Sequence, residues 1–191
     1  MEFWPRFRLA VVISIVYTIL AVLYSFVGLL NPQPPISIIQ YATFTEIGGH
    51  LLFGFIVGIF SFDLIIALKA AAFAVLVDAG KILSEFGIPI QASVNHSITF
   101  MILSALILGY IFRSKIKFEK LAAITVAAFL SHIAYDIIDS GPTAIPLLSP
   151  FSFTGFILPP WAVIPIEILG ILIVVWAFKE NALSFIRKIK I

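Results

Sequence analysis

Three histidines, His50, His96 and His132, are the only imidazoles in this chain of 191 residues. Each lies within or at the edge of a strongly apolar stretch, with a carboxylate or a small polar residue nearby. Imidazole exchanges protons near neutral pH and is the commonest side-chain ligand of protein-bound metals. The topology indicated by the basic residues brings all three near one membrane face. We therefore expect one polar site in the outer half of the molecule.

One pair of residues has the spacing of two ligands on a helix. His132 and Asp136 are four residues apart and share a helix face, and Asp139 lies a further turn along it. This spacing suits two ligands of one metal, or a histidine oriented by a carboxylate. A buried hydrogen bond that locks two helices together would leave the same pattern, and the spacing alone favours neither reading.

Glu46 and His50 repeat this spacing at the start of another apolar stretch. The intervening Gly48-Gly49 pair lets a second backbone or a ligand approach closely. A carboxylate in the first turn of a helix also interacts favourably with the helix dipole. We interpret Glu46 as a residue of the helix cap and His50 as a site residue.

Asp78, Lys81 and Glu85 share one face of a further helix. We expect Lys81 and Glu85 to form an ion pair that neutralises charge in the bilayer, and Asp78, which lies deeper, to be a ligand. Asn95 is a natural N-cap for the next helix, and His96 beside it is expected to belong to the site.

Carboxylates and imidazoles without thiolates suit zinc, or a harder divalent ion such as manganese or magnesium. The chain has no Cys, which excludes disulfides, thiolate sites and cysteine nucleophiles. It also lacks a Gly-x-Ser-x-Gly elbow, a Walker loop and a His-Glu-x-x-His motif. Because no outward-facing basic patch is indicated, nucleic-acid binding is not expected.

Composition requires lipid as the solvent. Hydrophobic residues make up 61% of the chain, charged residues 12%, and the mean hydropathy is +1.14. A soluble domain of this size has too little interior for so much apolar surface. No repeat or second domain is visible, so residues 1–191 are expected to form a single transmembrane domain.

The apolar stretches predict an all-α, polytopic membrane protein, a bundle of about six transmembrane helices. The expected spans are 9–30, 47–62, 64–86, 95–112, 121–138 and 161–178. Within the second span, Gly54 and Gly58 form a Gly-x-x-x-Gly motif, which permits close packing inside the monomer or between protomers of a homo-oligomer.

Lys and Arg alternate between the connections. They precede the first span, lie at the second and fourth connections and follow the sixth span; this set comprises Arg6, Arg8, Lys69, Arg113, Lys115, Lys117, Lys120, Lys179, Arg187, Lys188 and Lys190. The first, third and fifth connections have none. By the positive-inside rule this places both termini in the cytoplasm, in the cell or inner membrane. Lys81 is the exception, in the outer half of the third span.

Several motifs recur in the order found in a known family: Gly49-His50-Leu51-Leu52-Phe53, Leu76-Val77-Asp78, Asn95-His96-Ser97, Leu130-Ser131-His132-Ile133-Ala134-Tyr135-Asp136 and Ile145-Pro146-Leu147-Leu148-Ser149-Pro150-Phe151. They resemble the inner-membrane, metal-dependent hydrolases, also called LexA-binding inner-membrane-associated hydrolases. The resemblance covers about residues 49–159, more than half of the chain. The Ser-His-x-x-x-Asp block with its downstream Pro-Leu-Leu run is the most specific part.

That family in turn distantly resembles the zinc-dependent phospholipase C group, which cleaves phosphodiesters. The resemblance implies a metal-dependent hydrolase acting on a phosphoester, in a lipid or lipid-linked substrate that reaches the outer leaflet or in a small phosphoester. The implied metal ligands are His50, Asp78, His96, His132 and Asp136. The metal-bound water would be the nucleophile, with Asp139 or Glu46 as the general base.

The chain departs from the family pattern at two places. Where the family usually has Pro-Asp-x-Asp-His, this chain reads Val77-Asp78-Ala79-Gly80-Lys81. Where the family has His-Arg-Gly-x-Thr-His-Ser, it reads Gln91-Ala92-Ser93-Val94-Asn95-His96-Ser97. A site with two or three metals would lose ligands, whereas the five retained residues suffice for one ion.

Two other functions fit the same residues. Lys81 could replace the positive charge of the ion, which would give a non-catalytic membrane protein with a binding or structural role. The buried carboxylates and histidines could also serve a small transporter as a proton or ion relay. The relay reading accounts for the charges but not for the ordered motifs.

Overall fold

The computed structural model describes residues 3–31, 43–81, 86–88, 90, 92–139 and 144–189, and this part of the chain is almost entirely helical. The α-helices are α1 (Phe3–Ser25), α2 (Phe44–Ile59), α3 (Leu64–Leu76), α5 (Ile98–Ile111), α6 (Phe118–Asp139), α7 (Val163–Ala177) and α8 (Lys179–Ile189). Short 3-10 helices cover Phe26–Leu30, Ala92–His96 and Pro160–Ala162. A two-residue strand β1 (Ala144–Ile145) pairs antiparallel with β2 (Phe156–Ile157). The predicted all-α class is confirmed.

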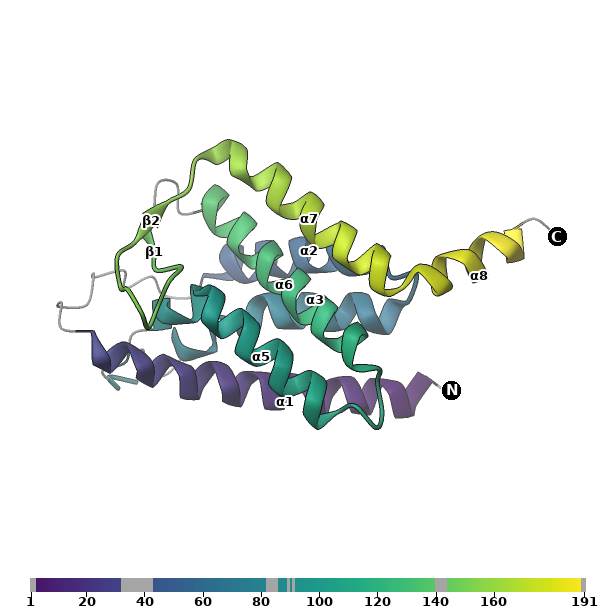
Figure 1. Cartoon of the computed structure of the whole chain (residues 1–191), viewed down its shortest axis with the longest axis horizontal. Helices are drawn as coiled ribbons and strands as arrows, with labels where there is room; N and C mark the ends of the chain where they lie inside the picture. Colours follow the sequence, from purple (N-terminus) through teal and green to yellow (C-terminus); the bar gives the residue numbers. More distant parts are fainter. Residues whose placement is uncertain are drawn as a thin grey trace.

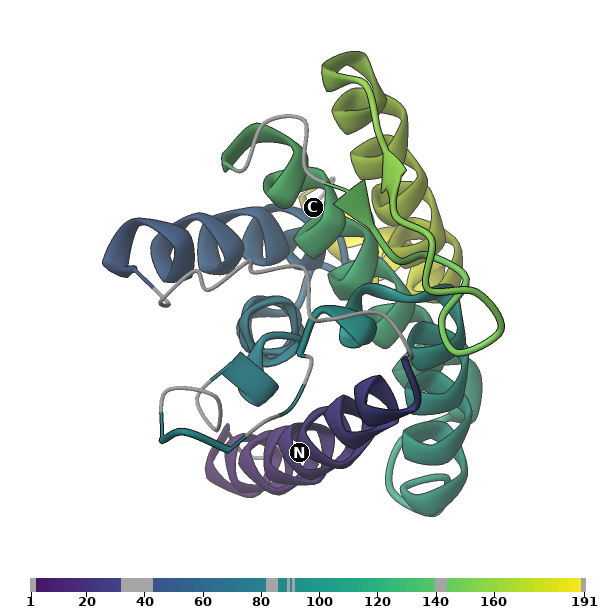
Figure 2. The same cartoon turned by 90° about the vertical axis from the view of Figure 1, so that its left-hand side faces the viewer.

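The helices surround α3 and α6 (Figures 1 and 2). Helix α3 packs against α1, α2 and α6. Helix α6 packs against α2, α3, α5 and α7. Of the most apolar 18 residues of α6, 72% are buried. The corresponding share is 28% in α1 with its 3-10 extension and 17% in the segment that contains α7. The apolar surfaces of α1 and α7 therefore face outward, where a lipid solvent would lie.

Three helical segments are long and apolar enough to cross a membrane: Phe3–Leu30, Phe118–Asp139 and Pro160–Ala177. The helices α2, α3 and α5 contain 16, 13 and 14 residues. At a rise of 1.5 Å per residue they are about 20–24 Å long, shorter than a hydrocarbon core of about 30 Å. Three helices thus support membrane association. The other three are too short to count, because each begins later or ends earlier than the apolar run that predicted a span.

Side-chain caps set several helix starts. The side chain of Thr43 accepts a hydrogen bond from the Glu46 amide at 3.1 Å, and the Glu46 carboxylate accepts one from the Thr43 amide at 3.4 Å, which completes a capping box. The carboxylate of Asp63 caps α3 and pairs with Arg6 of α1. The interpretation of Glu46 as part of the cap agrees with this geometry.

The prediction that Asn95 caps the fourth helix is wrong. The Ser97 hydroxyl accepts a hydrogen bond from the Phe100 amide and is the N-cap of α5. The preceding residues, Ala92–His96, form a 3-10 helix, so the α-helix starts after them and Asn95 turns into the interior. Lys69, predicted near the start of the third span and next to the second connection, lies in α3 and is buried.

The glycines of the Gly-x-x-x-Gly motif lie at the contact between α2 and α3. A Cβ atom on Gly54 would lie 2.6 Å from the Ala70 carbonyl oxygen, and one on Gly58 would lie 2.6 Å from the Ala67 Cα. Both separations are too short for a side chain. The motif therefore serves packing within the monomer.

Gly54→Val is expected to lower the free energy of unfolding by about 1–3 kcal/mol, because the new side chain forces α2 away from α3. Thermal unfolding of the detergent-purified protein measures this. Gly48→Ala is the matched control, since a Cβ there meets no described atom within 4 Å. An unchanged midpoint for Gly54→Val would contradict the packing described above.

Candidate metal centre

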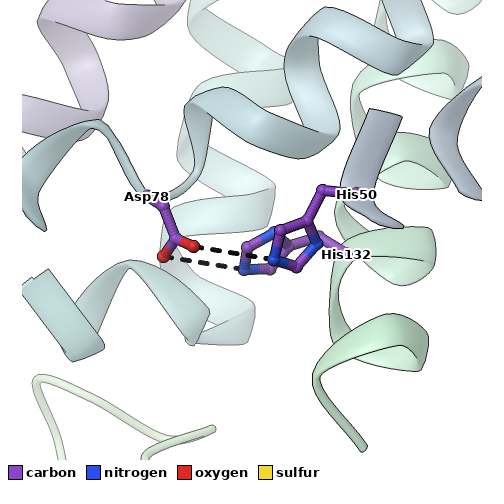
Figure 3. A group of neighbouring side chains, drawn as sticks. All are labelled: His50, Asp78 and His132. Carbon is purple, nitrogen blue, oxygen red and sulfur yellow. Dashed lines mark ion pairs between the residues drawn. The ribbon is translucent and has the colours of Figure 1, made fainter. Parts of the chain in front are cut away.

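Five polar side chains from four segments converge at one place, which we call the His/Asp cluster. It comprises His50 of α2, Asp78 just after α3, His96 at the end of the 3-10 helix before α5, and His132 and Asp136 of α6. Each is at most 9% exposed. Figure 3 shows Asp78 facing the stacked rings of His50 and His132. The structure thus brings together all five residues predicted as ligands.

The two carboxylates face the imidazole Nε2 atoms. Asp136 Oδ2 lies 3.2 Å from His96 Nε2 and 3.2 Å from His132 Nε2. Asp78 Oδ1 lies 3.4 Å from His96 Nε2 and 3.9 Å from His132 Nε2. The Nε2 of His50 lies 3.6 Å from Asp78 Oδ2 and 3.5 Å from Asp136 Oδ1. All three rings therefore direct Nε2 towards the same pair of carboxylates.

Backbone carbonyls fix the orientation of two rings. His132 Nδ1 lies 2.7 Å from the Ala74 carbonyl oxygen of α3, and His96 Nδ1 lies 3.1 Å from the Ser93 carbonyl oxygen. Since a carbonyl only accepts hydrogen bonds, both Nδ1 atoms carry the hydrogen in the neutral ring and both Nε2 atoms present a lone pair. These two Nε2 atoms are 3.0 Å apart. Lone pairs facing at that distance require a cation or a proton near them.

The cluster has more acceptors than donors. His50 Nε2, Asp78 Oδ1 and Asp136 Oδ2 are buried and make no hydrogen bond within the part of the chain that the structure describes. A buried polar atom left without a partner costs about 1–3 kcal/mol, and more when it is charged. A divalent cation would satisfy all of these atoms together. The set of donor atoms therefore fits a metal ion.

The spacing of the donor atoms fits the same interpretation. Ligands about 2.0–2.2 Å from a metal in tetrahedral arrangement lie about 3.3–3.6 Å from one another. The donor-atom separations given above run from 3.0 to 3.9 Å. Two groups of three residues each have one donor atom per residue within 4.8 Å of the other two. One group is His50, Asp78 and His132, and the other is His96, His132 and Asp136. The shared residue, His132, lies at the centre of the cluster.

Lys81 lies beside the cluster and contacts one of its carboxylates. Its Nζ atom is 2.7 Å from Asp78 Oδ2 and 2.6 Å from Glu46 Oε1. The other oxygen of Asp78 faces His96 and His132, so this carboxylate joins Lys81 to the cluster. The expected partner Glu85 lies outside the described residues, as does Gln91, one of the departures from the family pattern.

The two residues predicted as general bases lie outside the metal-ligand groups. Asp139 is exposed, and its Oδ1 is 3.3 Å from the Tyr135 hydroxyl. The Tyr135 ring packs edge-on against His50 with centroids 4.9 Å apart, so among the described residues it is Tyr135 that connects Asp139 to the cluster. Glu46 contacts the cluster through Lys81. A catalytic role for either carboxylate remains a prediction.

Asn95 supports the cluster in a way that the sequence did not indicate. Its fully buried amide donates to the Val77 carbonyl oxygen at 2.9 Å and to Ser25 Oγ at 3.0 Å. These bonds tie the segments that carry Asp78 and His96 to α1. The sequence does place this asparagine next to a site histidine, but the same position also suits a helix cap, which is how we interpreted it.

Glu167 is a second residue that sequence reasoning missed. It is the only charged residue in the apolar run 161–178. Its Oε1 atom accepts a hydrogen bond at 3.3 Å from Ser131, the neighbour of His132, while Oε2 is buried and has no hydrogen-bond partner among the described residues. A lone carboxylate in an apolar span is itself a signal of function.

Asn95→Ala is expected to lower the free energy of unfolding by about 1–3 kcal/mol, because it leaves the buried Val77 carbonyl without its donor. Ser25→Ala, which removes only one of the two bonds, should have the smaller effect. Thermal unfolding of the three purified proteins compares them. Equal midpoints for Asn95→Ala and the parent would show that this crosslink does not hold the site together.

Comparison with known proteins adds no relative. No protein-family model, no curated protein and no solved structure matches the chain. The residue motifs and the geometry of the His/Asp cluster are therefore the features of this chain that bear on its function.

Proposed function

We propose that this chain is a metal-dependent membrane hydrolase that cleaves a phosphoester, in a lipid or lipid-linked substrate. One observation carries the proposal. Five buried acceptor side chains converge, and two imidazole Nε2 lone pairs face each other at 3.0 Å. A divalent cation would satisfy these lone pairs and the two carboxylates together.

Zinc is the metal that suits three imidazoles and two carboxylates best, with manganese or magnesium as harder alternatives. His50, Asp78, His96, His132 and Asp136 would hold it. When bound, such an ion acidifies a coordinated water and polarises a phosphoryl oxygen, the chemistry of hydrolysis at neutral pH.

The remaining roles belong to residues around the ligands. The Ala74 and Ser93 carbonyl oxygens keep His132 and His96 in the tautomer that directs a lone pair at the centre. Lys81 holds Asp78 and Glu46 together. Because the cluster is buried, bulk water is excluded and electrostatic interactions inside it are strengthened. The proposed general base is Glu46 or Asp139; Lys81 lies between Glu46 and the ligand Asp78, and Tyr135 lies between Asp139 and the ligand His50.

The six-span topology with both termini in the cytoplasm belongs to this proposal. This topology requires the short helices α2, α3 and α5 to cross the membrane together with adjoining irregular segments. Irregular backbone at membrane depth is tolerated where it is buried in protein. The 3-10 helix Ala92–His96 fits this requirement, since Val94, Asn95 and His96 are buried. The cluster then lies in the outer half, within reach of lipid headgroups.

The contact of Lys81 with Asp78 favours a second candidate. In it, the lysine ammonium replaces the ion, and the protein has a binding or structural role without catalysis. Lys81 satisfies Asp78 Oδ2 at 2.7 Å. The second carboxylate oxygen, Asp78 Oδ1, and Asp136 Oδ2 have no hydrogen-bond donor among the described residues, which is why the metal hypothesis is preferred.

The detergent-purified protein is expected to contain about one equivalent of zinc or manganese, measured by mass spectrometry. His132→Ala should lose it, because this imidazole belongs to both ligand groups. Glu167→Gln is the matched control, as it changes a neighbouring carboxylate outside those groups. A parent protein that stays metal-free after reconstitution would overturn the hydrolase proposal, whereas full metal occupancy in His132→Ala would overturn the ligand assignment.

Lys81→His separates the two candidates. If Lys81 replaces the ion, the parent takes up no metal and the variant, which has lost the ammonium and gained an imidazole, takes it up. If the parent is a metalloprotein, the parent already binds metal tightly and the gain is absent. Equilibrium dialysis of both proteins against zinc distinguishes these outcomes. Phosphoester lipids are then the substrates to screen with the metal-loaded parent.

A further inference from the structure

The chain between α6 and α7 has no charged side chain over a long stretch. Residues 140–166 contain no Asp, Glu, Lys, Arg or His. The described part of this stretch begins with β1 and leads through β2 into Pro160–Ala177, which is long and apolar enough to cross a membrane. Figure 1 shows the β1–β2 loop, residues 146–155, at the end of the bundle opposite to both chain termini. The loop therefore lies where this candidate span begins.

The β1–β2 loop is fixed to the bundle at its base. Ile145 is buried in the apolar core, and Leu147 packs against that core. The Ile98 amide at the start of α5 donates a hydrogen bond to the Leu147 carbonyl oxygen at 2.9 Å. The Tyr24 hydroxyl of α1 donates one to the Ser149 carbonyl oxygen at 3.1 Å. The loop is thus held against α1 and α5 rather than detached from them.

Other apolar side chains of the same stretch are uncovered. Phe151 is 88% exposed, Ile157 64% and Trp161 72%, and Leu148 and Phe156 are exposed as well. Single apolar residues on a protein surface need no explanation. Here five of them follow one another within fourteen residues, from 148 to 161, with no charge between them. An apolar stretch of this kind requires an apolar or interfacial environment.

The turn that carries Phe151 satisfies backbone groups internally. The amides of Phe151 and Ser152 both donate to the Leu148 carbonyl oxygen, at 2.9 and 3.1 Å. The Ser149 amide donates to the Pro146 carbonyl oxygen at 3.1 Å. A backbone polar group without a partner is costly away from water, and these bonds reduce that cost. The turn can therefore carry its exposed phenylalanine into the edge of a bilayer.

Continuity and charge identify lipid as what covers this surface. The stretch runs directly into a candidate membrane span, and its last exposed aromatic residue, Trp161, stands at the start of that span. Aromatic side chains are enriched at the depth of lipid headgroups, and tryptophan most of all with tyrosine. A surface without charges also offers a protein partner no ion pair, whereas contact with a zwitterionic lipid requires none.

We propose that the β1–β2 loop lies in the membrane interface at the cluster end of the molecule, with Phe151 inserted among zwitterionic phospholipids. This makes the loop a lipid-binding element in addition to the helices that cross the bilayer. The inference is independent of hydrolase activity and of metal binding, because none of its residues belongs to the His/Asp cluster.

The chain has no Cys, so single cysteines introduced in the full-length protein can each carry one nitroxide label. Phe151→Cys reports on the loop. Ile168→Cys, at an exposed position inside α7, is the lipid reference, and Ser114→Cys, exposed between α5 and α6, is the water reference. All are placed in phosphatidylcholine nanodiscs. Electron paramagnetic resonance measures collision with oxygen and with a neutral, water-soluble nickel chelate.

The ratio of oxygen to nickel collisions at position 151 is expected to lie well above the value at 114 and below the value at 168. A second label, Leu148→Cys, tests what anchors the loop. Burial of a phenylalanine favours a docked state by about 10- to 100-fold, so adding Phe151→Asp should lower the ratio at 148 to that at 114. Phe44→Asp, the same change at a phenylalanine that is 96% exposed outside the loop, should leave the ratio at 148 unchanged.

Three outcomes overturn the proposal. A ratio at 151 equal to that at 114 would place the loop in water. Protection of position 151 from both reagents would assign the apolar surface to a second copy or another protein. An unchanged ratio at 148 in Phe151→Asp would show that Phe151 does not anchor the loop. The label at 168 checks folding in each case, since the ratio there must remain that of a lipid-facing site.

Discussion

The rest of the structure depends on the excess of hydrogen-bond acceptors in one buried place. Two imidazole nitrogens face each other at 3.0 Å, and two carboxylates surround them. In a low-dielectric interior this arrangement is costly unless a positive charge compensates it. Lys81 compensates part of the negative charge from one side, and the proposed metal ion would compensate the rest. The surrounding helices must hold these groups against their own repulsion, which explains why backbone carbonyls fix two of the three rings.

The packing of the helices follows from this requirement. Residues from α2, α3, α6 and the 3-10 helix before α5 must meet at one depth, so the helices approach closely there. Gly54 and Gly58 let α2 lie directly against α3. The Asn95 amide connects Val77, next to Asp78, to α1 and so fixes the residues beside Asp78 and His96 against that helix. Polar crosslinks of this kind are stronger in a buried, low-dielectric place than in water.

The molecule has two chemically different ends. One end carries the His/Asp cluster and a single lysine, Lys81. The other carries the basic residues of α1, of the α5–α6 connection and of α8. Figure 1 shows both chain termini and α8 at this second end. The His/Asp cluster and most of the basic residues therefore lie at opposite ends of the bundle.

The sequence by itself determined the all-helical class, the apolar helices that suit a membrane, the identities of the five clustered residues and the cap at Glu46, because composition and helical spacing are local properties. It did not determine the helix lengths, the burial of Lys69, the inward turn of Asn95 or the place of Glu167. Only the tertiary structure decided that Lys81 pairs with Glu46, 35 residues away, and that two imidazole lone pairs confront each other. Those features depend on which helix faces meet, and packing between distant segments fixes that choice.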